Sequence, residues 1–475
     1  MKSAPRVPLR PMNRGTIVEK LQITAITSEG KSLGRHDGLV VFVAGAVPGD
    51  VADVEITYKR RRFLEGKINY LHKASPFRSE SFCQHFGTCG GCKWQHLSYA
   101  AQLKYKQDHV AENLHKISGL DLPLINPIIG SEETMYYRNK LEYTFSNKRW
   151  LTAEEIGSDT VLERNGLGFH VPGKFDKVLD LNECYLQADP SNRIRMTLKA
   201  YALENGLTFF DIRDQHGLLR NLIIRTATTG EVMVIVQFFE PNKKAIIAVM
   251  EFLKNEFPEI TSLNYIINEK KNETFHDQDV VCYAGSPYIQ EKMADLTFRI
   301  GPKSFYQTNS KQAERLYEVA ARMAALTGTE TVYDLYTGTG TIANYVARTA
   351  KKVIGVEYVP EAIEDAHVNS QINGITNTQF FAGDMKDVLS DSFVHENGRP
   401  DVIIVDPPRA GMHEDVVEML QRIKPDRLVY VSCNPATQAR DIEWLSEAFS
   451  VEEIQPVDMF PHTQHVENVI LLKAL

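Results

Sequence analysis

The sequence predicts an α/β protein built from three parts. Residues 1–75 contain short strand-like runs between Gly and Pro turns, which is typical of a small β-barrel. Residues 76–300 combine several strand-like runs with a helical stretch at 243–255, so an α+β middle domain is expected. In residues 301–475, apolar strand runs alternate with helices and end in glycine or acidic residues, as in a Rossmann-like domain with a parallel sheet.

The composition fits a soluble globular chain of several domains. Of the 475 residues, 43% are hydrophobic and 24% are charged, so sizeable cores are available. No apolar run reaches the roughly 18–20 residues that span a bilayer. The basic start MKSAPRVPLRPMNRG lacks the apolar segment of a secretory signal. We therefore expect a cytoplasmic protein with no membrane partner.

Charge is distributed unevenly along the chain. The net charge is −8, but residues 1–75 carry 13 Lys and Arg against 7 Asp and Glu, while the remaining residues carry 40 against 54. A basic module on an acidic body indicates a polyanionic partner that binds at one end. A solvated basic tail is the alternative.

The barrel prediction rests on residues 13–74. Strands are expected at 16–19, 22–26, 39–43 and 51–57. The segment Tyr58–Phe63 then places four cations between two aromatic residues. Cations bind phosphates and aromatic rings stack on unpaired bases, so this composition favours RNA. A charged edge that prevents strand aggregation is the alternative explanation.

Four cysteines have the pattern of a ligand set. Cys83, Cys89 and Cys92 lie within one Gly-rich loop of ten residues, and Cys184 is the obvious fourth soft ligand. Four thiolates fit an iron–sulfur cluster or a structural Zn²⁺. Zinc sites usually consist of two closely spaced Cys pairs, so the stretched spacing favours the cluster. His85 and His96 are weaker candidates as ligands.

The middle of the chain shows no catalytic motif. A cation-rich helix is expected at 98–118, and Tyr136–Lys140 leads into a strand at 141–145. Cys282 lies in an apolar strand run and is expected to be an inert core thiol. Further strands are expected at 167–170, 178–181, 222–226, 232–238 and 263–268.

The C-terminal part begins with a nucleotide-type turn. A strand at 331–335 runs into a turn containing Gly338 and Gly340, and Glu357 ends the next strand, where an acid can accept hydrogen bonds from ribose hydroxyls. Ala343 stands where the dinucleotide fingerprint has its third glycine, so this turn alone does not exclude NAD. Together with Gly383-Asp384 and Asp406-Pro407-Pro408, the pattern favours S-adenosylmethionine (SAM).

Two buried-strand patterns in Asp401–Pro435 end in reactive side chains. One runs into Asp406, and the other runs into Cys433-Asn434-Pro435. Ligands of an open parallel sheet bind beyond the carboxyl ends of its strands, so Asp406 and Cys433 are expected to face one crevice. The alternative for Cys433 is a buried core thiol with no catalytic role.

With these motifs in order, the chain resembles the SAM-dependent RNA methyltransferases that act on carbon 5 of uracil. The resemblance rests on Gln307, the Gly-rich turn, Asp-Pro-Pro-Arg-Ala-Gly, Ser-Cys-Asn-Pro and the tail 460–467. Residues 15–74 look like a TRAM domain, a small RNA-binding barrel related to OB folds. This module and the cysteines make the chain similar to the 23S rRNA branch of the family, because the tRNA branch typically lacks both.

The resemblance implies roles for individual residues. Cys433 would be the nucleophile and Glu467 the base. The cysteine set would hold a [4Fe-4S] cluster, the helix at 98–118 would pack with the 301–475 domain, and a monomer is expected. Thr341 stands where some members have Asn, which puts its contact with SAM in doubt. The residues implied to line the SAM site are Gln307, Tyr336, Glu357, Asp384 and Asp406.

The implied chemistry explains the two catalytic residue types. Carbon 5 of uracil is a poor nucleophile until a thiolate adds to carbon 6, and a base must then remove the carbon 5 proton. The thiolate must be available near neutral pH, so a lowered Cys433 pKa is expected. Arg409 would touch RNA or orient the Asp406 loop, and His462 and His465 would position the base or pack.

Three other functions are compatible with parts of the sequence. A tRNA uracil methyltransferase would use the same chemistry. A non-catalytic ribosome-assembly factor would keep the fold but would not need the nucleophile. Amino-group methylation through Asp-Pro-Pro would leave Cys433 and Glu467 unexplained.

Overall fold

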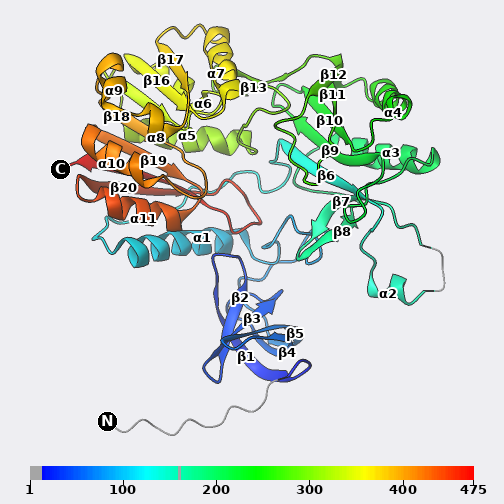
Figure 1. The fold of residues 1–475 in the computed structure, drawn as a ribbon. Coiled ribbons are helices and arrows are strands. Elements are labelled where there is room, and N and C mark those ends of the chain that lie inside the picture. The colour runs from blue at the N-terminus through cyan, green and yellow to red at the C-terminus, as the bar shows by residue number, and fades with distance from the viewer. Residues whose placement is uncertain (1–12, 159–161) are drawn as a thin grey trace, which may run out of the picture. The chain divides into compact units, whose positions relative to one another are not determined.

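The computed structural model describes residues 13–158 and 162–475 (Figure 1). The chain forms two compact units. The first contains the described residues up to Gly87, together with Gly91–His109 and Pro461–Gln464. The second contains Thr88–Gly90, Val110–Phe460 and His465–Leu475. Among the described residues, no helix combines the length and the apolar character needed to cross a membrane.

The first unit contains a closed barrel of five strands in the order β1-β2-β3-β5-β4, which confirms the predicted architecture. Alternate residues such as Val41, Val43 and Val54 fill its interior and are fully or almost fully buried. The period of two in the sequence arises because successive side chains of a strand point to opposite faces. The strands are β1 (Ile17–Ile26), β2 (Ser32–His36), β3 (Leu39–Ala44), β4 (Val51–Lys59) and β5 (Phe63–Lys73).

The basic segment Tyr58–Phe63 forms the hairpin between β4 and β5. Its four cations are exposed, and the guanidinium of Arg60 lies 5.4 Å from the ring centre of Tyr58. Tyr58 is 44% exposed, whereas Phe63 packs edge-on against Phe42 with ring centres 5.5 Å apart. Only one of the two aromatic residues is therefore presented to solvent with the cations.

A seven-stranded sheet forms the middle of the chain, in the order β12-β11-β10-β9-β6-β7-β8. Helix α4 (Lys243–Glu256) connects β10 to the parallel strand β11. Helix α3 (Ser191–Glu204) and the short α2 (Ala153–Ile156) were not predicted. The strands are β6 (Lys140–Ser146), β7 (Gly166–Val171), β8 (Lys174–Asp180), β9 (Leu219–Thr226), β10 (Val232–Phe238), β11 (Ile260–Ile267) and β12 (Val280–Gly285).

The expectation that Cys282 is a core thiol was wrong. Cys282 is exposed, because its strand β12 is the edge of the middle sheet and packs on one side only. An apolar run of this length does not distinguish a central strand from an edge strand.

The C-terminal sheet also has seven strands, in the order β17-β16-β15-β18-β19-β21-β20. The first five are parallel, while β21 is antiparallel to both β19 and β20. The strands are β15 (Thr331–Leu335), β16 (Lys352–Glu357), β17 (Thr378–Ala382), β18 (Val402–Val405), β19 (Arg427–Ser432), β20 (Phe449–Val457) and β21 (Glu467–Ala474). A separate hairpin, β13 (Ile289–Met293) and β14 (Leu296–Ile300), precedes them.

Helices cover both faces of the C-terminal sheet (Figure 1). Along β18, Val402 and Ile404 pack in one apolar cluster, and Ile403 and Val405 pack in the other. One face is covered by α5 (Ser310–Ala324), α6 (Thr341–Ala347) and α7 (Pro360–Ile372). The other is covered by α8 (Met385–Val388), α9 (Asp391–Asn397), α10 (Glu414–Ile423) and α11 (Pro435–Leu445). The sheet is buried on both sides, which explains the continuous apolar runs in the sequence.

A helix far from this domain in the sequence contributes to its core. The segment predicted as one helix comprises α1 (Tyr99–Asn113) and a π-helical turn, η1 (Leu114–Ser118). Val110 and Leu114 are fully buried in the cluster that also contains Ile442 of α11. The core around the C-terminal sheet is therefore built from segments that are far apart in the sequence.

Candidate active site

The predicted site residues lie at the carboxyl ends of the parallel strands. The strand order reverses between β15 and β18, which is where an open parallel sheet forms a crevice. Tyr336 directly follows β15, and Asp406 directly follows β18. Glu357 ends β16, and Cys433 follows β19. The structure thus brings residues separated by about 100 positions to one edge of one sheet.

The antiparallel strand β21 brings Glu467 to Cys433. Ser432, the last residue of β19, pairs with Asn468 near the start of β21. Cys433 and Glu467 are the next residues beyond this pair, so they lie across from each other at the same edge. Residues opposite each other in adjacent strands are near neighbours. Glu467 is only 4% exposed, and Cys433 is half-buried.

The protein groups around Cys433 disfavour ionisation of the thiol. Burial is the main cause that raises the pKa of Cys433 to about 11, and the negative charges of Glu467 and Asp406 add to it. The positive charge of Arg409 opposes them and lowers the pKa. The expected lowering of the Cys433 pKa is therefore wrong. Any depression must come from cations brought near the sulfur.

Two carboxyl groups beside the thiol are also hard to ionise. Burial raises the pKa of Asp406 to about 7. Burial and the neighbouring Asp406 raise the pKa of Glu467 well above its ordinary value, against the opposing charge of Arg409. Perturbed groups of this kind cluster where proton transfer occurs. A raised carboxyl pKa suits a group that must accept a proton near neutral pH.

The Gly-rich turn after β15 has the geometry of a ligand cradle. Gly340 has φ of +76°, and a Cβ at this position would lie 2.9 Å from the Ala366 side chain. Only glycine fits this close approach. Tyr336, before the turn, has φ of +66°, and burial raises its pKa. The Gly338 N–H donates to the Glu357 carboxylate over 3.1 Å, so the turn and the predicted ribose-binding acid are joined.

Asp384 and Gln307 complete the predicted set. Asp384 is the N-cap of α8, where its carboxylate accepts a hydrogen bond from the Lys386 N–H. Gln307 precedes α5, and its carbonyl accepts a hydrogen bond of 2.9 Å from the Asn139 side chain. The hydroxyl of Thr341, the residue that stands where some family members have Asn, lies 3.4 Å from the Tyr317 hydroxyl.

Sequence reasoning missed the side chains that hold the Gln307 segment. Asn139 also donates from its side chain to the Ser310 hydroxyl over 2.8 Å and from its main chain to the Thr308 carbonyl over 2.8 Å. The buried Arg225 of β9 donates to the Ser304 carbonyl over 2.7 Å. The middle sheet therefore positions a segment of the crevice. The motif Tyr136–Lys140 was noticed, but a sequence pattern cannot reveal such a long-range contact.

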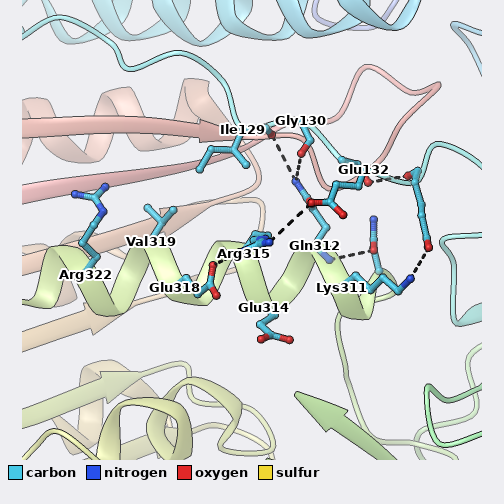
Figure 2. A pocket seen from close by; sticks show the side chains of 13 residues that line it. Ile129, Gly130, Glu132, Lys311, Gln312, Glu314, Arg315, Glu318, Val319 and Arg322 are labelled. Carbon is cyan, nitrogen blue, oxygen red and sulfur yellow. Dashed lines mark hydrogen bonds and ion pairs between the residues drawn. The ribbon is translucent and has the colours of Figure 1, made fainter. Parts of the chain in front are cut away.

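Residues that line a pocket beside α5 also help to hold the segment around Gln307 in place (Figure 2). In it, the Gln312 side chain donates to the Gly130 carbonyl over 3.2 Å. The charged side chains that line it largely pair with one another, as Lys311 does with Glu133 and Arg315 with Glu318. The contacts of Gln312 and Lys311 thus hold the segment before Asn139 against α5.

The two histidines of the tail occupy different environments. His465 Nδ1 lies 3.4 Å from a guanidinium nitrogen of Arg409, in the crevice. His462 belongs to the first unit, where its main-chain N–H donates to the Gln102 side chain over 2.7 Å. The His462 ring also packs edge-on against Phe82.

The carboxyl group of Asp334 is buried beneath the Gly-rich turn, and its raised pKa can be tested. It is fully buried in β15, and burial raises its pKa to about 7, although the Thr337 hydroxyl donates to it. The folded state therefore holds a proton that the unfolded state releases above about pH 4. Stability should fall as pH rises towards 7 and level off above it.

We expect Asp334→Asn to remove this pH dependence. Between pH 5 and pH 8, the unfolding free energy of the wild type should fall by about 2 kcal/mol more than that of the variant. Urea unfolding at several pH values measures this difference. Asp406 titrates in both proteins, so its contribution cancels. Parallel stability curves for the two proteins would contradict the prediction.

Comparisons with known proteins identify the family of the chain. A family model described as tRNA (Uracil-5-)-methyltransferase matches residues 225–475, and a TRAM domain model matches residues 14–68. An uncharacterized RNA methyltransferase of Bacteroides thetaiotaomicron is 55% identical over 452 residues, covering 94% of this chain and 100% of the relative. One from Chlorobaculum tepidum is 40% identical over 465 residues, covering 96% of each chain.

A solved structure is similar over nearly the whole chain. It is the Pyrococcus abyssi tRNA (uracil-54, C5)-methyltransferase in complex with S-adenosyl-L-homocysteine. The TM-score is 0.74 at 29% sequence identity, covering 95% of this chain and 100% of that chain.

Proposed function

Because the chain belongs to the tRNA (uracil-5-)-methyltransferase family and is an RNA methyltransferase, we propose that it methylates carbon 5 of a uridine in 23S rRNA. The observation that carries the chemistry is the placement of Cys433 opposite Glu467 beyond the Ser432–Asn468 pair. A thiol and a buried carboxyl are the two groups that this methylation requires. SAM is the methyl donor.

The proposed reaction begins at the thiol. The Cys433 thiolate adds to carbon 6 of the uracil, and the electron pair moves to carbon 5, which becomes the nucleophile. Bound SAM supplies an electrophilic methyl group on a positively charged sulfur. After transfer, Glu467 accepts the proton from carbon 5. The bond between the sulfur and carbon 6 then breaks, which restores the double bond and the Cys433 thiolate. The uridine must leave its stack to reach these groups.

The proposed SAM site follows the turn after β15. Glu357 stands where it can bind the ribose hydroxyls, at the cost of its bond to the Gly338 N–H. Asp384 and Asp406 would accept from amino groups of the ligand. Tyr336 offers a ring against which the ligand can pack, and Gln307 closes the site from the segment before α5.

Replacement of Asn139 by alanine should loosen this segment. The variant loses two side-chain hydrogen bonds, to the Gln307 carbonyl and the Ser310 hydroxyl. At about 1 kcal/mol or less for each bond, the KM for SAM should rise about tenfold, while kcat at saturating SAM changes about twofold at most. Initial rates at varied SAM concentration measure both values. Asn126→Ala is the control, because Asn126 bonds Glu453 instead. An unchanged KM in Asn139→Ala would contradict the positioning role.

The four cysteines fit a [4Fe-4S] cluster in their donor chemistry, since four thiolates are its usual ligands. Cys184 is buried, and its main-chain N–H and carbonyl both bond the Asn192 side chain, which fixes the residue. A Cβ on Gly90 would lie 2.9 Å from the His170 carbonyl, so the backbone here packs closely. We propose Cys83, Cys89, Cys92 and Cys184 as ligands, with structural zinc as the lesser alternative. A cluster would supply stability or shape rather than the methyl-transfer step.

Two observations support different RNA substrates. The TRAM domain and the four cysteines favour 23S rRNA by resemblance, and the exposed cations of the β4–β5 hairpin suit a polyanion. The solved structure that is similar over the whole chain is instead a tRNA methyltransferase. We propose rRNA as the substrate and keep tRNA as the second candidate.

One experiment separates the candidates. The purified protein is incubated with tritiated SAM and either unmodified 23S rRNA or unmodified tRNA, and the nucleosides are then analysed. Label in 5-methyluridine from 23S rRNA is the expected result. Label from tRNA alone would retain the mechanism and overturn the substrate. Tight RNA binding without label on either RNA would favour a ribosome-assembly factor.

A further inference from the structure

The main chain of Arg409 is fixed beside the turn that carries Cys433. Its carbonyl accepts a hydrogen bond of 2.9 Å from the Asn434 side chain and one of 3.2 Å from the Thr437 hydroxyl. Asn434 directly follows Cys433 and caps α11. The loop after β18 and the turn after β19 are therefore joined at the residue next to the nucleophile.

The Arg409 guanidinium is available to act on the crevice. Among the described residues, no carboxylate lies within ion-pair distance of it. One of its nitrogens lies 3.4 Å from His465 Nδ1, and the guanidinium lies close enough to Cys433 to lower the pKa of the thiol. Its charge also acts on Glu467. An arginine without a carboxylate partner keeps its full charge for such neighbours.

The thiol needs this positive charge. The groups that face Cys433 are Glu467 from β21, Asp406 and Arg409 from the loop after β18, and the N-terminus of α11. Burial and the two acids oppose the thiolate, whereas a cation and a helix N-terminus favour it. Arg409 is the side chain that can offset the acids at the sulfur.

We propose that Arg409 is a further catalytic residue, whose guanidinium hydrogen-bonds the Cys433 sulfur and stabilises the thiolate that attacks carbon 6 and is later released. This inference rests on the proposed function, in which Cys433 is the nucleophile. It assigns Arg409 to the reacting sulfur rather than to an RNA phosphate.

Alkylation of Cys433 by iodoacetamide tests the proposal without RNA or SAM. The rate at Cys433 is followed by peptide mass spectrometry from pH 6 to pH 10, since only the thiolate reacts. Arg409→Gln should react about tenfold more slowly near pH 7.5 and shift the pH curve upwards by about one unit. Arg409→Lys, which keeps the charge, should lie between the two. Arg422→Met, which removes an exposed cation of α10 paired with Asp391, should match the wild type.

The outcomes decide between the two roles of Arg409. Coincident alkylation curves for the wild type and Arg409→Gln would overturn the proposal, and weaker RNA binding by that variant would then assign Arg409 to a phosphate. If Arg409→Gln does not fold cooperatively, the comparison of Arg409→Lys with the wild type decides alone: the proposal requires a slower rate in the variant. Absence of methyl transfer by the wild type to any RNA would instead refute the proposed function, because the alkylation curves do not depend on it.

Discussion

Cys433→Ala is expected to abolish methyl transfer, with a rate loss on the order of 10⁴-fold or more. The variant lacks the atom that adds to carbon 6, so carbon 5 stays a poor nucleophile. The substituted side chain is half-buried in a turn beyond β19, and losing one sulfur there should leave the fold intact. Single-turnover transfer of tritium from SAM to RNA measures the loss.

The matched control is Cys282→Ala. Cys282 is a free, exposed thiol on the edge strand β12 of the middle sheet. Its removal should change the rate about twofold at most, as is usual for an exposed position far from the chemistry. Activity of Cys433→Ala above one hundredth of the wild-type rate would show that methylation does not require this covalent step.

Glu467→Gln should divide the reaction in two. The amide cannot accept the carbon 5 proton, so turnover should fall by about 10³-fold while the earlier addition and methyl transfer proceed. Methylated RNA should then remain covalently bound to Cys433, approaching one RNA per enzyme. This adduct should survive boiling in detergent and be detected on a denaturing gel. The double variant with Cys433→Ala should lose it.

The control for this prediction is Glu452→Gln, since Glu452 is an exposed carboxylate of β20 that pairs with Lys473. It should turn over normally and trap nothing. The pH dependence supplies a second check. A base with a raised pKa is inactive while protonated, so the wild-type rate should rise with pH through that raised value. Normal turnover by Glu467→Gln would show that another group removes the proton.

The ends of the strands were predictable from the sequence because local signals mark them. The run at 402–405 is apolar throughout and the run at 331–335 is largely apolar, as expected for strands covered on both faces, and each ends in a polar or glycine-rich turn. The rule that ligands bind beyond the carboxyl ends of parallel strands then places Asp406 and Cys433 at one crevice. The barrel was equally predictable from the sequence, because its alternating strands and tight turns are local patterns.

The support of the crevice was not predictable in this way. Asn139 and Arg225 reach the segment 304–310 across more than 75 residues of chain. Such contacts depend on how the middle sheet packs, and no local periodicity encodes them. The exposure of Cys282 was missed for a similar reason, since neighbouring strands, rather than the strand itself, decide whether it is an edge.

The sequence by itself determined the parallel core of the C-terminal domain, the nucleotide-type turn and the presence of a thiol at a strand end. Only the tertiary structure decided that Glu467 faces this thiol, because β21 enters the sheet antiparallel beside β19 in the register Ser432 to Asn468. It also decided the electrostatics of Cys433, since burial and the two acids raise its pKa while Arg409 opposes them. Reactivity depends on charges brought together across the fold, and these interactions exist only once the chain has folded.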